Sequence, residues 1–185
     1  MRFPITEHVC KTQRHTTTYL SCGLQDSPLI VFVHGWPDLG IGWRHQLRCF
    51  GDLGFRAVAP DMRGYGSSTV HRDKSAYAIE ESVADMLELL DHLGCDQAIW
   101  VGHDWGAPVV WGLASHHPER CAGVAGLCVP YLPDGFAPEV LIPMVDRTIY
   151  PENEFPAGQW DYQLYYEEHF EDAQRVFEAS VLDTV

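Results

Sequence analysis

Basic residues are scarce in this 185-residue sequence. It has 12 lysines and arginines against 26 aspartates and glutamates, for a formal net charge of −14 at pH 7. A surface of that sign repels nucleic acid and anionic membranes, so we expect neither as a partner. Hydrophobic residues make up 46 % of the chain and charged residues 21 %, a composition that argues against intrinsic disorder. The length is enough for one ordinary domain with a sizeable core.

Long apolar runs and paired cysteines are also missing. We find no segment long enough to span a membrane, and the first 20 residues lack the apolar stretch of a secretory signal. The cysteines form neither a C-x-x-C pair nor a zinc-like pattern; they are Cys10, Cys22, Cys49, Cys95, Cys121 and Cys128. We therefore expect a cytoplasmic protein with reduced thiols and no metal site. Disulfides in a secreted domain are the alternative.

Apolar runs alternate with amphipathic stretches over the first 130 residues. This pattern predicts an α/β fold with a mostly parallel, doubly wound sheet and helices on both faces. The expected strands are 16–21, 29–33, 55–59, 98–101 and 123–129, and the expected helices are 41–53, 79–93 and 105–116. In the helix over 79–93 the acidic residues lie mostly opposite the apolar ones. We interpret them as a solvated face: Glu80, Glu81, Asp85 and Glu88.

The composition changes after Pro130. Six prolines lie between Pro130 and Pro156, and an aromatic, helix-like segment then runs from Gln159 towards Ala179. We predict that residues 1–130 form the α/β core and that residues 131–185 form the beginning of a separate covering segment, or cap.

Residues 102–106, Gly-His-Asp-Trp-Gly, have the spacing of the nucleophile elbow of serine hydrolases, with an aspartate in place of the serine. Such a strand-to-helix turn is crowded, so the residues two before and two after the nucleophile must be small. Gly102 and Gly106 meet this requirement around Asp104. A glycine-flanked turn with a chance aspartate is the alternative interpretation.

A second motif, His34-Gly35-Trp36-Pro37, follows the expected buried strand 29–33. A backbone N–H at this point can face the elbow and pair with the N–H of the residue after the nucleophile, and the two would form an oxyanion hole. The presence of this motif argues against a chance aspartate at the elbow.

Together with the segment DMRGYGSS at 61–68, these motifs resemble those of the epoxide hydrolases of the α/β-hydrolase superfamily, over nearly the whole chain. The resemblance implies that Asp104 is the nucleophile and that the backbone amides of Trp36 and Trp105 are the oxyanion donors. It also implies a cis peptide bond before the motif proline. The other motif residues would support this geometry: His34, Gly35, Pro37, Gly102 and Gly106. We assign DMRGYGSS no catalytic role.

The segment WDYQLYY at 160–166 resembles the cap stretch of these enzymes in which a tyrosine followed by glutamine donates a proton to the opening ring. That role transfers to Tyr162. A phenol with a pKa of about 10 stays protonated at neutral pH and can donate. The alternative is an aromatic stripe that packs the cap on the core, and we interpret Tyr165 and Tyr166 in that way.

The resemblance further implies a reaction. A carboxylate that is ionised at neutral pH can attack an epoxide carbon, and water then hydrolyses the resulting ester with Asp104 to release a vicinal diol. The expected partners are a small apolar epoxide and water. No cofactor is expected, and the sequence leaves a homo-oligomer open.

Ester hydrolysis needs a histidine base and an acid that orients it, and in this fold both follow the nucleophile along the chain. His116, His117 and His169 lie at an expected helix end or in the cap, not on a loop after the last strand. Asp134 is a weaker candidate for the acid than a residue beyond Val185. We therefore expect this chain to be the first part of a longer enzyme, without the histidine and acid for full turnover.

Two other functions stay open. A haloalkane or haloacid dehalogenase also uses an elbow aspartate, although the asparagine usual in the haloalkane HGxP motif is Trp36 here, and the arginines of the fluoroacetate type do not follow Asp104. A truncated, non-catalytic module that binds a ligand or a partner chain is the alternative from another class. The presence of Asp104, the HGWP motif and Tyr162 together argues against it.

Overall fold

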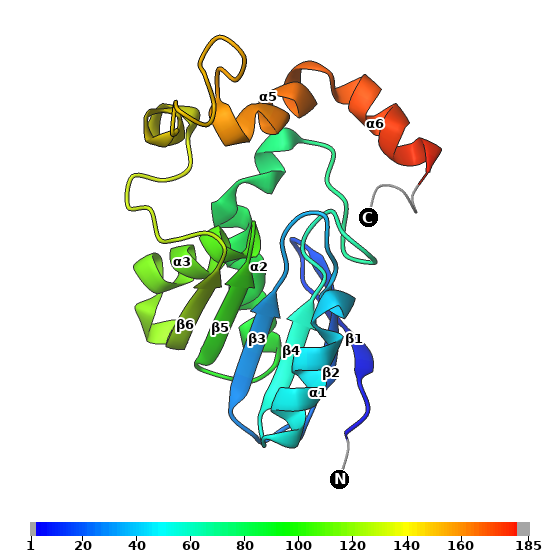
Figure 1. Ribbon diagram of the computed structural model, residues 1–185. Helices are drawn as coiled ribbons and strands as arrows, with labels where there is room; N and C mark the ends of the chain where they lie inside the picture. The colour runs from blue at the N-terminus through cyan, green and yellow to red at the C-terminus, as the bar shows by residue number, and fades with distance from the viewer. Residues whose placement is uncertain (1–2, 181–185) are drawn as a thin grey trace. The chain divides into compact units, whose positions relative to one another are not determined.

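The computed structural model describes residues 3–180 (Figure 1). The chain divides into two compact units, with the division between Tyr131 and Leu132. The helices of the described part are all short, and none of them is long and apolar enough to cross a membrane. All six cysteines carry free thiols.

The first unit is built around a six-stranded sheet with the order β1-β2-β4-β3-β5-β6 (Figure 1). Its strands are β1 (Thr6–Lys11), β2 (Thr16–Cys22), β3 (Leu29–Val33), β4 (Arg56–Pro60), β5 (Ala98–His103) and β6 (Cys121–Leu127). The last four are parallel to one another, and β2 pairs antiparallel with both β1 and β4. The expectation of a mostly parallel sheet is confirmed.

Helices cover both faces of this sheet: α1 (Arg44–Asp52), α2 (Ile79–His92) and α3 (Gly106–His116). Successive side chains of β3 point to opposite faces, and every residue of the strand is buried. Phe32 packs in one cluster with Leu47 of α1, whereas Val31 packs in the other with Met86 of α2 and Val110 of α3. The sheet is therefore doubly wound, as its apolar strands predicted.

Two elements of the first unit differ from the sequence-based expectation. β1 was not expected, because it is an edge strand in which only Cys10 is buried, so it carries no apolar alternation. The expected helix 41–53 begins with a 3-10 turn, Gly40–Trp43, and becomes α-helical only at Arg44. Gly40 and Gly42 lie in this turn, and glycine is a poor residue for a helix interior. Further 3-10 turns are Lys74–Tyr77 and Pro118–Arg120.

The second unit consists of short helices: α4 (Pro138–Leu141), α5 (Asp161–Glu168), α6 (Phe170–Ala179) and the 3-10 turns Ile142–Met144 and Gly158–Trp160. The single helix expected over 159–179 is interrupted at His169, which separates α5 from α6. Arg147 ties two parts of the proline-rich segment together. Its guanidinium donates hydrogen bonds to the carbonyl oxygens of Phe155 (2.8 Å) and Pro156 (3.0 Å). The role of this unit as a cap stays a prediction.

A buried charged cluster joins the β1–β2 hairpin to α2 and corrects one expectation. Asp85 is not part of a solvated face: it is 2 % exposed and accepts hydrogen bonds from Arg63 (Nε and Nη2, both 2.7 Å) and Arg14 (Nη1, 2.9 Å). His15 is also buried, with its Nδ1 3.1 Å from Nε2 of His71. The two guanidinium groups neutralise the buried carboxylate, as a charge removed from water requires.

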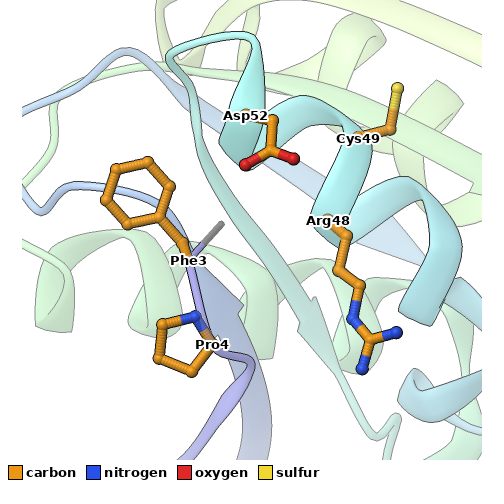
Figure 2. A pocket seen from close by; sticks show the side chains of 5 residues that line it. All are labelled: Phe3, Pro4, Arg48, Cys49 and Asp52. Carbon is orange, nitrogen blue, oxygen red and sulfur yellow. The ribbon is translucent and has the colours of Figure 1, made fainter. Parts of the chain in front are cut away.

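A hollow of about 560 Å³ lies between the N-terminal segment and α1 (Figure 2). Its lining residues are Phe3, Pro4, Arg48, Cys49 and Asp52. None of the residues of the HGWP or elbow motifs lines this hollow, so it is separate from the residues that the sequence selected for function.

The turn from β5 into α3 has the crowded backbone of a nucleophile elbow. Asp104, at its tip, has a φ of +51°, a left-handed conformation that is uncommon outside glycine. A Cβ atom on Gly102 would overlap the carbonyl oxygen of Gly106, and one on Gly106 would overlap the carbonyl oxygen of Val33 at the end of β3. Both elbow glycines are therefore required by the close approach of backbone to backbone.

We predict that Gly106→Ala lowers the free energy of unfolding by about 1–3 kcal/mol, because backbone atoms cannot move aside as a flexible side chain can. Gly123→Ala in β6 is the matched control, since a Cβ there has no neighbour closer than 3.9 Å. Urea unfolding of both variants measures the difference. Equal stability of the two variants would contradict the close packing at the elbow.

We also predict that the free energy of unfolding falls as the pH is lowered from 7 to 5. Burial lowers the pKa of His15, against the opposing charge of Asp85. Below the ordinary histidine pKa of about 6.5, the unfolded chain therefore binds this proton more readily than the folded chain, and stability present at higher pH is lost. His15→Asn removes this titration but keeps a hydrogen-bonding amide near the Nδ1 position. Urea unfolding at both pH values should show a smaller loss in this variant, and an equal loss would refute the assignment.

Candidate active site

Asp104 is brought to the loop after β3 by the pairing of neighbouring parallel strands. Val33 of β3 lies opposite Gly102 of β5, so the carboxyl ends of the two strands lie side by side. The Trp36 N–H in the following loop donates a 2.8 Å hydrogen bond to Oδ1 of Asp104. The two motifs singled out in the sequence therefore meet at one carboxylate oxygen.

Gly35 permits this approach. A Cβ at position 35 would overlap the Asp104 carboxylate and would lie 2.6 Å from the backbone nitrogen of Trp105. The amide nitrogens of Trp36 and Trp105 thus both lie next to Gly35 and Asp104. The peptide bond between Trp36 and Pro37 is cis, as the resemblance implied.

His34 is buried beneath this loop, with 1 % of its surface exposed. Its Nδ1 donates to the carbonyl oxygen of Gly35 (2.8 Å), and its Nε2 accepts from the N–H of Met62 (2.9 Å). Burial lowers the pKa of His34, although the Gly35 hydrogen bond and the charges of Asp61 and Asp38 oppose the shift. Both ring nitrogens of His34 therefore hydrogen-bond loop backbone.

His103, the other histidine of the motifs, contacts an aromatic ring: its imidazole lies edge-on to the indole of Trp43, with the ring centres 6.4 Å apart. Through this ring contact, His103 of the elbow motif touches Trp43, the last residue of the 3-10 turn that precedes α1.

The DMRGYGSS segment contributes a side chain that the sequence did not single out. The ring of Tyr65 lies edge-on to His34, with the ring centres 5.0 Å apart. Burial raises the pKa of Tyr65, and the Asp104 carboxylate raises it further. Tyr65 is therefore a neutral phenol close enough to Asp104 to sense its charge.

Exposed aromatic surface flanks the Asp104 backbone in the first unit. Trp36 is 39 % exposed and Trp105 is 41 % exposed, and these are the two residues whose amides lie next to the carboxylate. Each of these two residues therefore leaves part of a large apolar side chain on the surface of the first unit.

Tyr162 lies on α5 in the second unit. Its hydroxyl accepts a 3.0 Å hydrogen bond from Nε2 of Gln163, and its ring is edge-on to Tyr166. Its side chain is 42 % exposed. Its position over Asp104 stays a prediction, and so does the role of Asp134 as an acid, since Asp134 also belongs to the second unit.

Among residues 3–180, no group of three or more histidine, cysteine, aspartate or glutamate side chains could hold a metal ion. The described residues of the first unit do offer a carboxylate held by a backbone amide, with the Tyr65 phenol near it.

Comparison with known proteins identifies the family of the chain. Residues 28–179 match the alpha/beta hydrolase fold family. The chain is 50 % identical over 107 residues to Epoxide hydrolase B of Mycobacterium tuberculosis, covering 58 % of this chain and 30 % of the relative. It is 39 % identical over 163 residues to Epoxide hydrolase A of the same organism, covering 88 % of this chain and 48 % of the relative.

A solved structure also shows similarity to an epoxide hydrolase. The crystal structure of Epoxide Hydrolase A from Mycobacterium thermoresistibile superposes with a TM-score of 0.70 at 39 % identity, covering 74 % of this chain and 43 % of that one. The chain thus spans less than half the length of these relatives. The family match extends over most of this sequence, and it includes strands β3 to β6, the elbow and the HGWP loop. The chain therefore belongs to the α/β-hydrolase fold family, within which it is similar to epoxide hydrolases.

Proposed function

We propose that this chain carries the nucleophile and the ring-opening donor of an epoxide hydrolase. The observation that carries the proposal is the hydrogen bond from the Trp36 N–H to Asp104 at a glycine-flanked elbow. A serine at that place would suit attack on a carbonyl, whereas a carboxylate is already ionised and can attack a tetrahedral carbon. The similarity to epoxide hydrolases A and B supports the same chemistry.

The first step is alkylation of Asp104. Since Oδ1 is held by the Trp36 N–H, Oδ2 is the oxygen that attacks an epoxide carbon. A new C–O bond forms, the ring C–O bond breaks, and the ring oxygen takes up a proton. The product of this step is an ester between the Asp104 side chain and the substrate, which now carries one free hydroxyl.

Tyr162 supplies that proton. Its oxygen accepts a hydrogen bond from Gln163, which leaves the phenolic hydrogen available to donate to the ring oxygen. A donor that neutralises the developing alkoxide lowers the barrier to ring opening. The phenolate formed in this step recovers its proton from solvent.

The second step is hydrolysis of the ester. A general base takes a proton from water, whose oxygen adds to the ester carbonyl carbon of Asp104, and the negative charge of the tetrahedral intermediate falls on Oδ1. The amides of Trp36 and Trp105 stabilise this charge as an oxyanion hole. Collapse breaks the bond to the substrate oxygen, which takes the proton back from the base, so the vicinal diol is released and the Asp104 carboxyl group loses its remaining proton to solvent.

The exposed rings of Trp36 and Trp105 favour a small apolar epoxide as the substrate. A dehalogenase would form the same ester from an alkyl halide, and release of halide instead of a diol distinguishes that reaction. Trp36 stands at the position where the haloalkane enzymes usually have a halide-binding asparagine, which favours the epoxide. The free thiols of the chain fit the proposed cytoplasmic location.

We predict that an aryl epoxide adds the mass of one substrate molecule to the protein, on a peptide that contains Asp104. Asp104→Asn should abolish the adduct, because a neutral amide is a far poorer nucleophile, whereas the exposed control Asp26→Asn should not. Mass spectrometry of protein quenched in acid measures the adduct. In a longer version of the protein that carries the histidine base, a single turnover in ¹⁸O-water should leave label in the Asp104 carboxylate. Label in the diol alone would show that Asp104 acts as a base and would overturn the proposed nucleophile.

We further predict that Tyr162→Phe slows formation of this adduct by about 100-fold, the scale expected for loss of a catalytic proton donor. Tyr165→Phe is the matched control, since Tyr165 lies on the same helix and is similarly exposed. Adduct formation timed by mass spectrometry compares the two variants. Equal rates would assign the donor role to another residue.

A further inference from the structure

The peptide group between Gly35 and Trp36 is hydrogen-bonded at both of its ends. Its carbonyl oxygen accepts from Nδ1 of His34 (2.8 Å), and its N–H donates to Oδ1 of Asp104 (2.8 Å). The carbonyl and the N–H belong to one rigid, planar unit. A bond that fixes the direction of the Gly35 carbonyl therefore also fixes the direction of the Trp36 N–H.

The two backbone partners of His34 determine its protonation. The Gly35 carbonyl can only accept a hydrogen bond and the Met62 N–H can only donate one, so Nδ1 carries the hydrogen and Nε2 does not. The imidazole is therefore neutral. It connects the Met62 amide to the Gly35–Trp36 peptide and, through that peptide, to the Asp104 carboxylate.

We propose that His34 is a positioning residue for the oxyanion site: its neutral imidazole aims and polarises the Gly35–Trp36 peptide and thereby sets how firmly the Trp36 N–H holds Asp104. This inference rests on the proposed function for its catalytic consequence. Successive hydrogen bonds in a chain polarise one another, which makes the last donor stronger. Because His34 is almost fully buried, water does not compete for its partners.

The groups around His34 keep this arrangement intact at neutral pH. Burial lowers its pKa, whereas Asp61, Asp38 and the Gly35 carbonyl act in the opposite direction. The ring of Tyr65 covers it edge-on. Protonation would place a hydrogen on Nε2, directly opposite the Met62 N–H, and would break that bond.

Two substitutions separate the two hydrogen bonds of the imidazole. The amide of asparagine lies where Nδ1 lies, so His34→Asn keeps a donor towards Gly35 and loses the acceptor for Met62. The amide of glutamine reaches the Nε2 position, so His34→Gln keeps the acceptor for Met62 and loses the donor towards Gly35. His15→Gln is the control for loss of a buried imidazole elsewhere in the first unit.

The first measurement does not depend on catalysis. The chain has six tryptophans, so selective ¹⁵N-tryptophan labelling gives few backbone amide signals, from which that of Trp36 can be assigned. His34→Gln should move the Trp36 amide proton upfield and accelerate its exchange with solvent, His34→Asn should move it less, and His15→Gln should leave it in place. Imidazole ¹⁵N shifts of the unmodified chain at pH 7 should show Nδ1 protonated and Nε2 bare. The opposite tautomer would overturn the proposal without any variant.

The second measurement is the rate at which an aryl epoxide alkylates Asp104. We expect His34→Gln to be about tenfold slower than the unmodified chain, since a misplaced nucleophile loses rate steeply. His34→Asn should be less than about threefold slower, and His15→Gln should match the unmodified chain.

The two measurements distinguish the possible failures. If the unmodified chain forms no adduct but its Trp36 amide responds to His34→Gln, the proposed function is wrong and the positioning of the peptide by His34 stands. If the adduct forms normally and neither the amide signal nor the rate responds to His34→Gln, the role of His34 is refuted and the proposed function stands.

Discussion

The first unit depends on the close approach of two backbone segments at the carboxyl ends of β3 and β5. Gly35, Gly102 and Gly106 lie at this contact, and side chains on them would overlap neighbouring backbone or the Asp104 carboxylate. The approach is possible because β3 is buried on both faces and pairs directly with β5. The same packing that buries the sheet therefore places a carboxylate against the Trp36 amide.

The function proposed for Asp104 follows from what this contact supplies. A backbone N–H is a fixed donor that needs no side chain and cannot lose its proton at neutral pH, so it holds a carboxylate without neutralising it. His34 is likewise held by backbone groups, but in the interior. Its imidazole hydrogen-bonds both the loop after β3 and the segment after β4. Tyr65 covers this imidazole and remains a neutral phenol near Asp104. Asp104 and His34 are thus both held by hydrogen bonds to backbone groups.

Elsewhere in the first unit, a buried negative charge is paired with arginines. The chain is strongly acidic overall, yet the buried carboxylate of Asp85 is matched by Arg14 and Arg63. Arg63 belongs to the same segment as Met62 and Tyr65, so this cluster also fixes the loop that supports His34. The loop that carries Met62, Arg63 and Tyr65 therefore contributes both to the buried ion pairs and to the support of His34 at the candidate site. This explains why the segment DMRGYGSS can matter for function without donating a catalytic group.

The sequence by itself determined the α/β class, most strands and the elbow, because apolar alternation and glycine spacing are local properties. The residues proposed for catalysis were implied by the resemblance of the sequence motifs to those of epoxide hydrolases. It could not reveal β1, whose single buried side chain gives no periodic signal, or the burial of Asp85, whose partners lie far away along the chain. The partners of His34 were likewise decided by tertiary structure, since Met62 is distant in sequence and reaches the imidazole only when β3 and β4 pair. Local pattern selects which residues can do chemistry, and strand pairing decides which of them share a hydrogen bond.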